Sequence, residues 1–131
     1  MIEEKFRLEE IKDLSRRGED HLVEDKLLSY LEDYPDSLIA SHMLGGLYFN
    51  QNEYELAELY LNKVLNEKPL EPSANHGMYH ILWDTDRKEA AMNLIDAFLK
   101  GVEQNDHKIS STVESFLEIK EECIEKGVWS T

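Results

Sequence analysis

Apolar residues recur at helical spacing along most of the chain. Leu44, Leu47 and Tyr48, for example, are three and four positions apart, which places them on one face of a helix. Pro35 and Pro69 follow two of these amphipathic stretches and mark points beyond which a helix does not continue. Because the intervening turns are short, we expect antiparallel helical hairpins and an all-α fold. The pattern predicts six helices, over residues 3–16, 20–33, 37–50, 53–67, 72–84 and 87–102.

Residues at the expected helix starts and crossings add detail to this prediction. Asp36, Asn52 and Asp86 stand where N-caps are needed, because their side chains can accept hydrogen bonds from free backbone N–H groups. Gly45 and Ala57 lack bulk where two paired helices are expected to cross. Their backbones can therefore approach closely, and a larger residue at Gly45 should overpack the crossing.

The chain also repeats with a period of 34 residues. Small or turn-forming residues stand at one common position, as Gly18, Asn52 and Asp86. Such a period indicates stacked supersecondary units rather than unrelated helices. We therefore expect three repeats, over about residues 4–37, 38–71 and 72–105. Further matched sets are Leu14, Tyr48 and Leu82; Val23, Ala57 and Ala91; and Leu27, Leu61 and Ile95.

The middle repeat resembles a tetratricopeptide repeat. That family's pattern places Leu-Gly and Tyr in a first helix, then a small turn residue, an Ala, two apolar residues and a closing Pro. The resemblance implies one domain over residues 1–131, in which antiparallel helical hairpins stack as a short right-handed α-solenoid of about seven helices. The matching residues are Leu44-Gly45, Tyr48, Asn52, Ala57, Leu61, Val64 and Pro69.

A seventh helix is expected over about residues 107–126. Asn105 and Asp106 can cap its start, and Gly127 can end it in a left-handed turn. An amphipathic helix at this place would cover the exposed core face of the last repeat. A dimerisation helix is the alternative. Its apolar stripe consists of Ile109, Val113, Phe116, Leu117 and Ile124.

Composition and charge restrict the classes of partner. The 131 residues include 28 acidic and 14 basic side chains, which gives a net charge of −14. Nucleic acid and anionic membranes carry the same sign and are disfavoured, whereas a basic protein partner is favoured. No apolar run approaches the roughly 20 residues of a membrane helix, and the start of the chain is not a signal peptide. With Cys123 as its single cysteine, the chain is predicted to be cytoplasmic.

The sequence contains no group of residues that would support catalysis. It has no Gly-rich phosphate loop and no Gly-x-Ser-x-Gly motif, and its carboxylates are scattered along helix faces. Cys123 has no neighbouring His that would lower the pKa of its thiol. We therefore expect a protein that is not an enzyme and that needs no cofactor or metal.

Histidines are the most distinctive polar residues. His76 and His80 are four positions apart and share a helix face, and His42 stands one repeat before His76. Two His at this spacing could ligate a metal, but no carboxylate–histidine motif completes a site. Contact with a partner through neutral or pH-sensitive imidazoles is the favoured interpretation.

The family resemblance implies that first helices line a concave groove. Phe49 and Trp83 would then be either aromatic anchors for a partner or ordinary core residues. A set of side chains that clamps chaperone carboxylates in some relatives is missing, since Met43, Ser73 and Gly77 stand at three of its positions. The candidate groove residues are Leu8, Lys12, Arg16, His42, Phe49, Asn50, His76, His80, Trp83 and Asp84.

The resulting hypothesis is a non-catalytic protein-binding module, an adaptor or a chaperone, that holds a segment of a partner protein. A bacterial secretion chaperone is one subtype, because this family includes small acidic examples with three repeats. The alternative is an acidic stoichiometric inhibitor, such as an immunity protein for a basic toxin. A scaffold subunit or a fragment of a larger assembly is a third option. The identity of the partner and the oligomeric state stay open.

Overall fold

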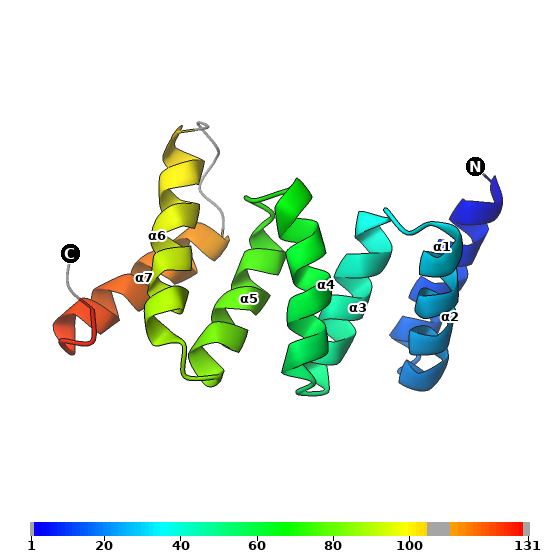
Figure 1. Ribbon diagram of the computed structural model, residues 1–131, viewed down its shortest axis with the longest axis horizontal. Helices are drawn as coiled ribbons and strands as arrows, with labels where there is room; N and C mark the ends of the chain where they lie inside the picture. The colour runs from blue at the N-terminus through cyan, green and yellow to red at the C-terminus, as the bar shows by residue number, and fades with distance from the viewer. Residues whose placement is uncertain (1, 105–110, 130–131) are drawn as a thin grey trace. The chain divides into compact units, whose positions relative to one another are not determined.

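The computed structural model describes residues 2–104 and 111–129, and within these ranges it contains helices and no strands (Figure 1). This confirms the predicted all-α fold, and the bounds of the first six helices lie within two residues of those predicted. None of the described helices is both long enough and apolar enough to cross a membrane. The helices are α1 (Ile2–Arg16), α2 (Asp20–Asp33), α3 (Leu38–Asn50), α4 (Tyr54–Glu67), α5 (Pro72–Asp84), α6 (Lys88–Gln104) and α7 (Ser111–Glu125).

The chain forms two compact units, unit 1 (Met1–Val64) and unit 2 (Leu65–Thr131). In unit 1, α1 and α2 form an antiparallel hairpin, and α2 also packs against α3 (Figure 1). Two tyrosines join these helices. The Tyr30 hydroxyl donates to Glu4 over 2.9 Å, and the Tyr48 hydroxyl donates to Glu24 over 2.7 Å. Burial raises the pKa of Tyr30 to about 12, so this hydroxyl stays a donor at neutral pH.

The helices α3 and α4 approach each other closely at Gly45. A Cβ atom placed on Gly45 would lie 2.8 Å from Cδ2 of Leu61, which is itself buried. Nearby, the rings of Tyr48 and Tyr60 stack with their centroids 5.9 Å apart. The prediction that Gly45 allows a close helix crossing is confirmed, because any side chain there would displace Leu61.

In unit 2, α5 and α6 form a second antiparallel hairpin, and α7 packs on both of its helices (Figure 1). The amphipathic α7 therefore covers the core face of this hairpin, as expected of a terminal helix. Asn105, Asp106 and Ile109, which sequence reasoning assigned to the start of this helix, lie outside the described residues. The buried cluster consists of Tyr79, Ala91, Met92, Ile95, Phe98, Val113, Phe116 and Cys123.

The 34-residue period is visible in the backbone of the hairpin turns. Gly18, Asn52 and Asp86 all adopt the left-handed conformation, with φ angles of 75°, 61° and 61°. In each turn the N–H of the next residue donates to a carbonyl five positions back, at Leu14, Tyr48 and Leu82 respectively. These bonds satisfy carbonyl groups at the helix C-terminus. The predicted N-cap role of Asn52 and Asp86 is therefore wrong, since each residue ends a hairpin's first helix.

The N-caps also recur at a 34-residue spacing. The Ser37 hydroxyl accepts from the Ala40 N–H over 3.2 Å, and the Glu71 carboxylate accepts from the Ala74 N–H over 2.6 Å. The cap predicted at Asp36 is thus one residue too early. A cap must have extended backbone while its side chain reaches forward, and Ser37 meets that condition with φ −67° and ψ 112°.

Gly127 has a φ of 73°, the left-handed conformation predicted for it at the end of α7. Behind this turn Trp129 folds back and packs, partly buried, against the core cluster of unit 2. From the sequence alone, Trp129 could equally pack or protrude, because no periodic pattern extends beyond Gly127. The C-terminal turn therefore extends the cover that α7 provides.

Candidate functional site

Four rings form a row along one side of α5, which we call the aromatic row: His76, Tyr79, His80 and Trp83. The His76 and His80 centroids are 4.6 Å apart, the Tyr79 and His80 centroids 5.1 Å, and the Tyr79 and Trp83 centroids 6.0 Å. Helical spacing of three and four residues produces this contact directly. The structure thus brings together three of the predicted groove residues in unit 2.

The α7 helix packs against the aromatic row through Phe116. Its ring is stacked on His76 with centroids 6.1 Å apart and lies 5.8 Å from Tyr79. Burial and, to a smaller extent, the neighbouring His80 lower the pKa of His76 below its usual value. His76 is therefore neutral at physiological pH and presents a half-buried, uncharged ring.

An apolar depression, which we call the Trp83 pocket, lies between the second half of α5 and the C-terminal part of α7. Its volume is about 260 Å³. Glu122 and Lys126 form an ion pair of 2.7 Å among its lining side chains. This pocket can accept a large apolar side chain, and Glu122 and Lys126 offer charged groups beside that side chain. The lining residues are Tyr79, Trp83, Ile119, Glu122, Cys123, Lys126 and Val128.

Trp83 has two roles at this pocket. One part of the ring packs against the core cluster of unit 2, and the side chain as a whole is half-buried. The Lys88 ammonium lies 5.2 Å from its ring centroid, at cation–π distance. The sequence offered core packing and partner anchoring as alternatives for Trp83, and the structure shows that the ring both packs and lines an open pocket.

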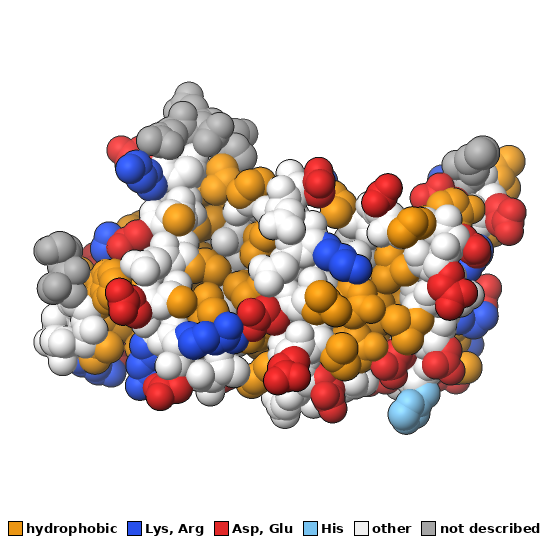
Figure 2. All heavy atoms as spheres, viewed as in Figure 1, with side chains coloured by type: hydrophobic (Ala, Val, Ile, Leu, Met, Phe, Trp, Pro, Cys, Tyr) orange, Lys and Arg blue, Asp and Glu red, His pale blue; other side chains and the backbone are white. Residues whose placement is uncertain are grey.

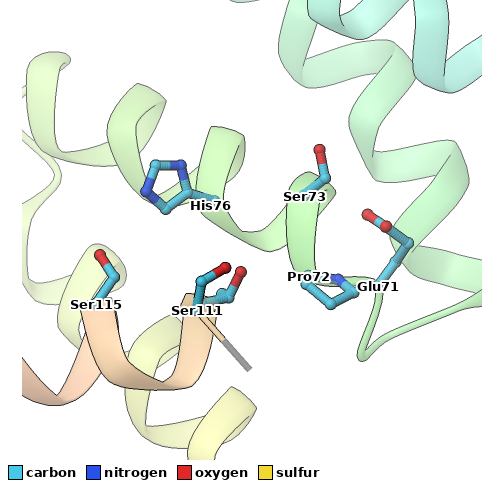
Figure 3. A pocket seen from close by; sticks show the side chains of 7 residues that line it. Glu71, Pro72, Ser73, His76, Ser111 and Ser115 are labelled. Carbon is cyan, nitrogen blue, oxygen red and sulfur yellow. The ribbon is translucent and has the colours of Figure 1, made fainter. Parts of the chain in front are cut away.

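A second depression, the polar pocket, lies between the first turns of α5 and α7 and has a volume of about 540 Å³ (Figure 3). Glu71, Ser73 and His76 line it from α5 and its N-cap, and Ser111 and Ser115 line it from α7. Hydroxyl groups, a carboxylate and a neutral imidazole can donate and accept hydrogen bonds. This pocket is suited to polar groups such as the backbone of a bound segment.

Unit 1 carries six of the seven other predicted groove residues, and there they are more dispersed. Leu8 is only 9% exposed and belongs to the core, so it offers little contact surface. Lys12 lies 3.6 Å from Glu9 in an ion pair. Phe49 is half-buried with its centroid 5.8 Å from that of Tyr54. Of the remainder, His42 is half-buried, and Arg16 and Asn50 are exposed, as is Asp84 in unit 2.

His76 and His80 stand at a spacing at which two His could ligate a metal. Among the described residues, no group of three or more His, Cys, Asp or Glu side chains is arranged to hold a metal ion. His76 instead uses one ring face for Phe116, and the pair lies edge to face. Aromatic packing is thus one interaction that both imidazoles make.

Sequence reasoning missed the contribution of α7 and the following turn. Ile119, Cys123 and Val128 line the Trp83 pocket, although only α5 was expected to supply contacts in this part of the chain. The apolar stripe of α7 indicated that one face would be buried. It could not indicate which edge of that face would stay open beside Trp83, because this depends on how α7 lies on the hairpin.

The sequence matches no known family and none of the curated proteins with which it was compared. The chain's own repeats, pockets and charges are therefore what indicate its function.

Proposed function

We propose that this protein is a non-catalytic protein-binding module of the tetratricopeptide type, working in the cytoplasm. It binds a segment of a partner protein along the side of unit 2 formed by the aromatic row and α7. The single observation that carries the proposal is the Trp83 pocket, in which an aromatic ring is presented on a rigid helix beside other apolar side chains. Large aromatic residues in such pockets dominate the free energy of many protein interfaces.

The two pockets suggest how a segment would be recognised. The Trp83 pocket, at about 260 Å³, is of a size for one apolar side chain rather than a complete small-molecule ligand. The polar pocket lies at the other end of α5 and offers hydrogen-bonding groups from Ser73, Ser111 and Ser115. A segment bound along α5 would thus combine an apolar anchor with polar contacts, the usual division between the centre and rim of an interface.

The experiment is capture of partners from a lysate of the source cells on three immobilised proteins: wild type, Trp83→Ala and Leu117→Ala. Leu117 is the matched control, because it is a 46% exposed apolar residue on α7 that does not line the pocket. Washes at about 0.05 M and about 0.5 M salt separate charge-driven from apolar binding. We expect a protein that wild type and Leu117→Ala retain in both washes and that Trp83→Ala loses.

Circular dichroism of each variant shows whether helical content is unchanged. If folded Trp83→Ala retains the same protein as wild type, the Trp83 pocket is not the binding site. The same conclusion follows if Leu117→Ala loses that protein to the same extent.

The net charge of −14 favours one second candidate function, an acidic stoichiometric inhibitor of a basic protein such as a toxin nuclease. Figure 2 shows acidic side chains distributed over the visible face. A surface of this kind accelerates association with a partner whose own site binds phosphate groups. This function predicts one basic protein, bound at low salt, released at high salt and unaffected by Trp83→Ala.

A further inference from the structure

The first two turns of α1 expose large apolar side chains to solvent. Ile2 is 76% exposed and Phe6 is 70% exposed, the two highest values among the large apolar residues of the described chain. They are four positions apart and lie on the side of α1 opposite to its buried residues Leu8 and Ile11. Because both side chains line one depression, they form a contiguous exposed apolar patch, which is the kind of feature that marks interaction sites.

Opposite charges accompany these two apolar residues. Lys5 and Glu9 line the same shallow depression as Ile2 and Phe6, which has a volume of about 300 Å³. Lys5 precedes Phe6, and Glu9 lies one turn after Lys5, so the charges stand on either side of Phe6 along the helix axis. In an α1 helix that runs in the opposite direction, Lys5 and Glu9 exchange their order along the axis.

We propose that this face of α1 binds the same face of a second copy of the chain, with the two α1 helices antiparallel. Phe6 then packs beside Phe6 of the second copy, close to the two-fold axis, and Ile2 covers its edge. Lys5 of each copy lies opposite Glu9 of the other, which gives two symmetric ion pairs across the interface. Glu9 keeps its contact of 3.6 Å with Lys12 of its own chain, so each Glu9 carboxylate then lies between two lysines. Self-complementarity of this kind is what a two-fold interface requires, because the same patch must serve as both partners.

The rest of the face limits the size of this contact. Towards its C-terminus α1 presents Lys12, Asp13 and Arg16, and Asp13 is already bonded to Arg17 over 2.6 Å. The apolar part therefore covers only the first two turns of α1. Such an interface is smaller than those of stable dimers, so the dimer is weak and depends on protein concentration.

Sedimentation equilibrium of the purified chain, over about 5–500 μM, tests the proposal directly. We expect a monomer–dimer equilibrium in this range for wild type. Phe6→Glu should raise the dimer dissociation constant at least about tenfold, because it removes the central apolar contact. Leu59→Glu is the matched control, since Leu59 is 51% exposed on α4, and it should dimerise as wild type does.

A charge exchange tests the antiparallel arrangement itself. Lys5→Glu and Glu9→Lys each place like charges opposite one another and should each weaken the dimer about fivefold. The double variant Lys5→Glu/Glu9→Lys restores both pairs in exchanged positions and should dimerise as wild type does. The varied residues are all exposed, and circular dichroism confirms that each variant is folded; they are Lys5, Phe6 and Glu9 on α1 and Leu59 on α4.

A wild-type chain that is monomeric throughout this range overturns the proposal. So does a dimer that Phe6→Glu leaves unchanged, which would place the interface elsewhere. The antiparallel pairing of Lys5 with Glu9 is excluded if the double variant dimerises no more tightly than the two single variants. None of these results bears on the Trp83 pocket, which lies in unit 2.

Discussion

Gly45 and Gly46 are neighbours in α3, but their surroundings differ. A Cβ on Gly45 would meet Leu61 at 2.8 Å, whereas a Cβ on Gly46 would meet nothing within 4 Å. Both changes to Ala gain about 1 kcal/mol of helix propensity. Only Gly45→Ala must also push a buried leucine aside, which costs about 1–3 kcal/mol. We therefore expect Gly45→Ala to be less stable than Gly46→Ala by about this amount.

Urea denaturation of the two glycine variants measures this difference in the free energy of unfolding. Because both variants gain the same helix propensity, comparing them isolates the contact with Leu61. Equal stability of the two would mean that α3 and α4 do not cross closely at Gly45.

His76 predicts a pH dependence of stability. Burial against α7 and the adjacent His80 lower its pKa in the folded chain, while in the unfolded chain the value is about 6.5. As the pH falls below about 6.5, the unfolded chain therefore takes up this proton before the folded chain does. The contribution of neutral His76 to the free energy of unfolding is fully present above the pKa of the unfolded chain. It is lost as the pH falls through the pKa of His76 in the folded chain.

The free energy of unfolding, measured by urea denaturation between about pH 7.5 and 5, should fall less steeply in His76→Gln than in wild type. His21→Gln, at a position exposed on α2, is the control for the loss of an imidazole as such. A slope that His76→Gln does not alter would show that His76 titrates alike in both states.

At the scale of the elements, α7 is the cover of the α5–α6 hairpin. Phe116 is fully buried and meets Phe98 edge to face with centroids 5.3 Å apart, whereas the adjacent Leu117 is largely exposed. Phe116→Ala should therefore cost about 3–5 kcal/mol through lost contacts and a cavity. Leu117→Ala should cost about 1 kcal/mol or less.

Thermal or urea denaturation of this neighbouring pair checks whether α7 is part of the folded core. A Phe116→Ala variant as stable as Leu117→Ala would contradict the packing of α7 on the hairpin.

The positions of the helices follow from local signals, and this is why they could be predicted. Apolar spacing gives each helix its extent, and Pro35 and Pro69 end two of them. The caps were harder, because Asp and Asn suit both an N-cap and a left-handed turn. At Asn52 and Asp86 the turn prevails, as it does at Gly18 one repeat earlier, where no side chain could act as a cap.

The candidate site was predictable only in part, for a related reason. His76, His80 and Trp83 are neighbours through helical spacing within α5, so the sequence alone could bring them together. Cys123 and Val128 join Trp83 only because α7 and the turn after it lie across the hairpin. Tertiary packing of this kind leaves no local pattern in the sequence. For the same reason, the sequence could not show that Leu8 is a core residue rather than an exposed groove residue.

For the whole molecule, charge and apolar anchoring make opposite predictions about salt. The net charge of −14 attracts a basic partner, and this attraction is screened as salt is raised. The surface of unit 2 adds an apolar pocket whose contacts are not screened. A module that holds its partner through Trp83 should therefore keep most of its affinity at high salt, whereas an acidic inhibitor should not.

The most direct test of the account is titration calorimetry of the captured partner segment against wild type, Trp83→Ala and Leu117→Ala, at about 0.05 M and about 0.5 M salt. We predict that Trp83→Ala weakens binding about thirtyfold at both salt concentrations and that Leu117→Ala stays within about twofold of wild type. Binding that is unchanged in Trp83→Ala but lost at high salt would contradict the account and support the acidic inhibitor.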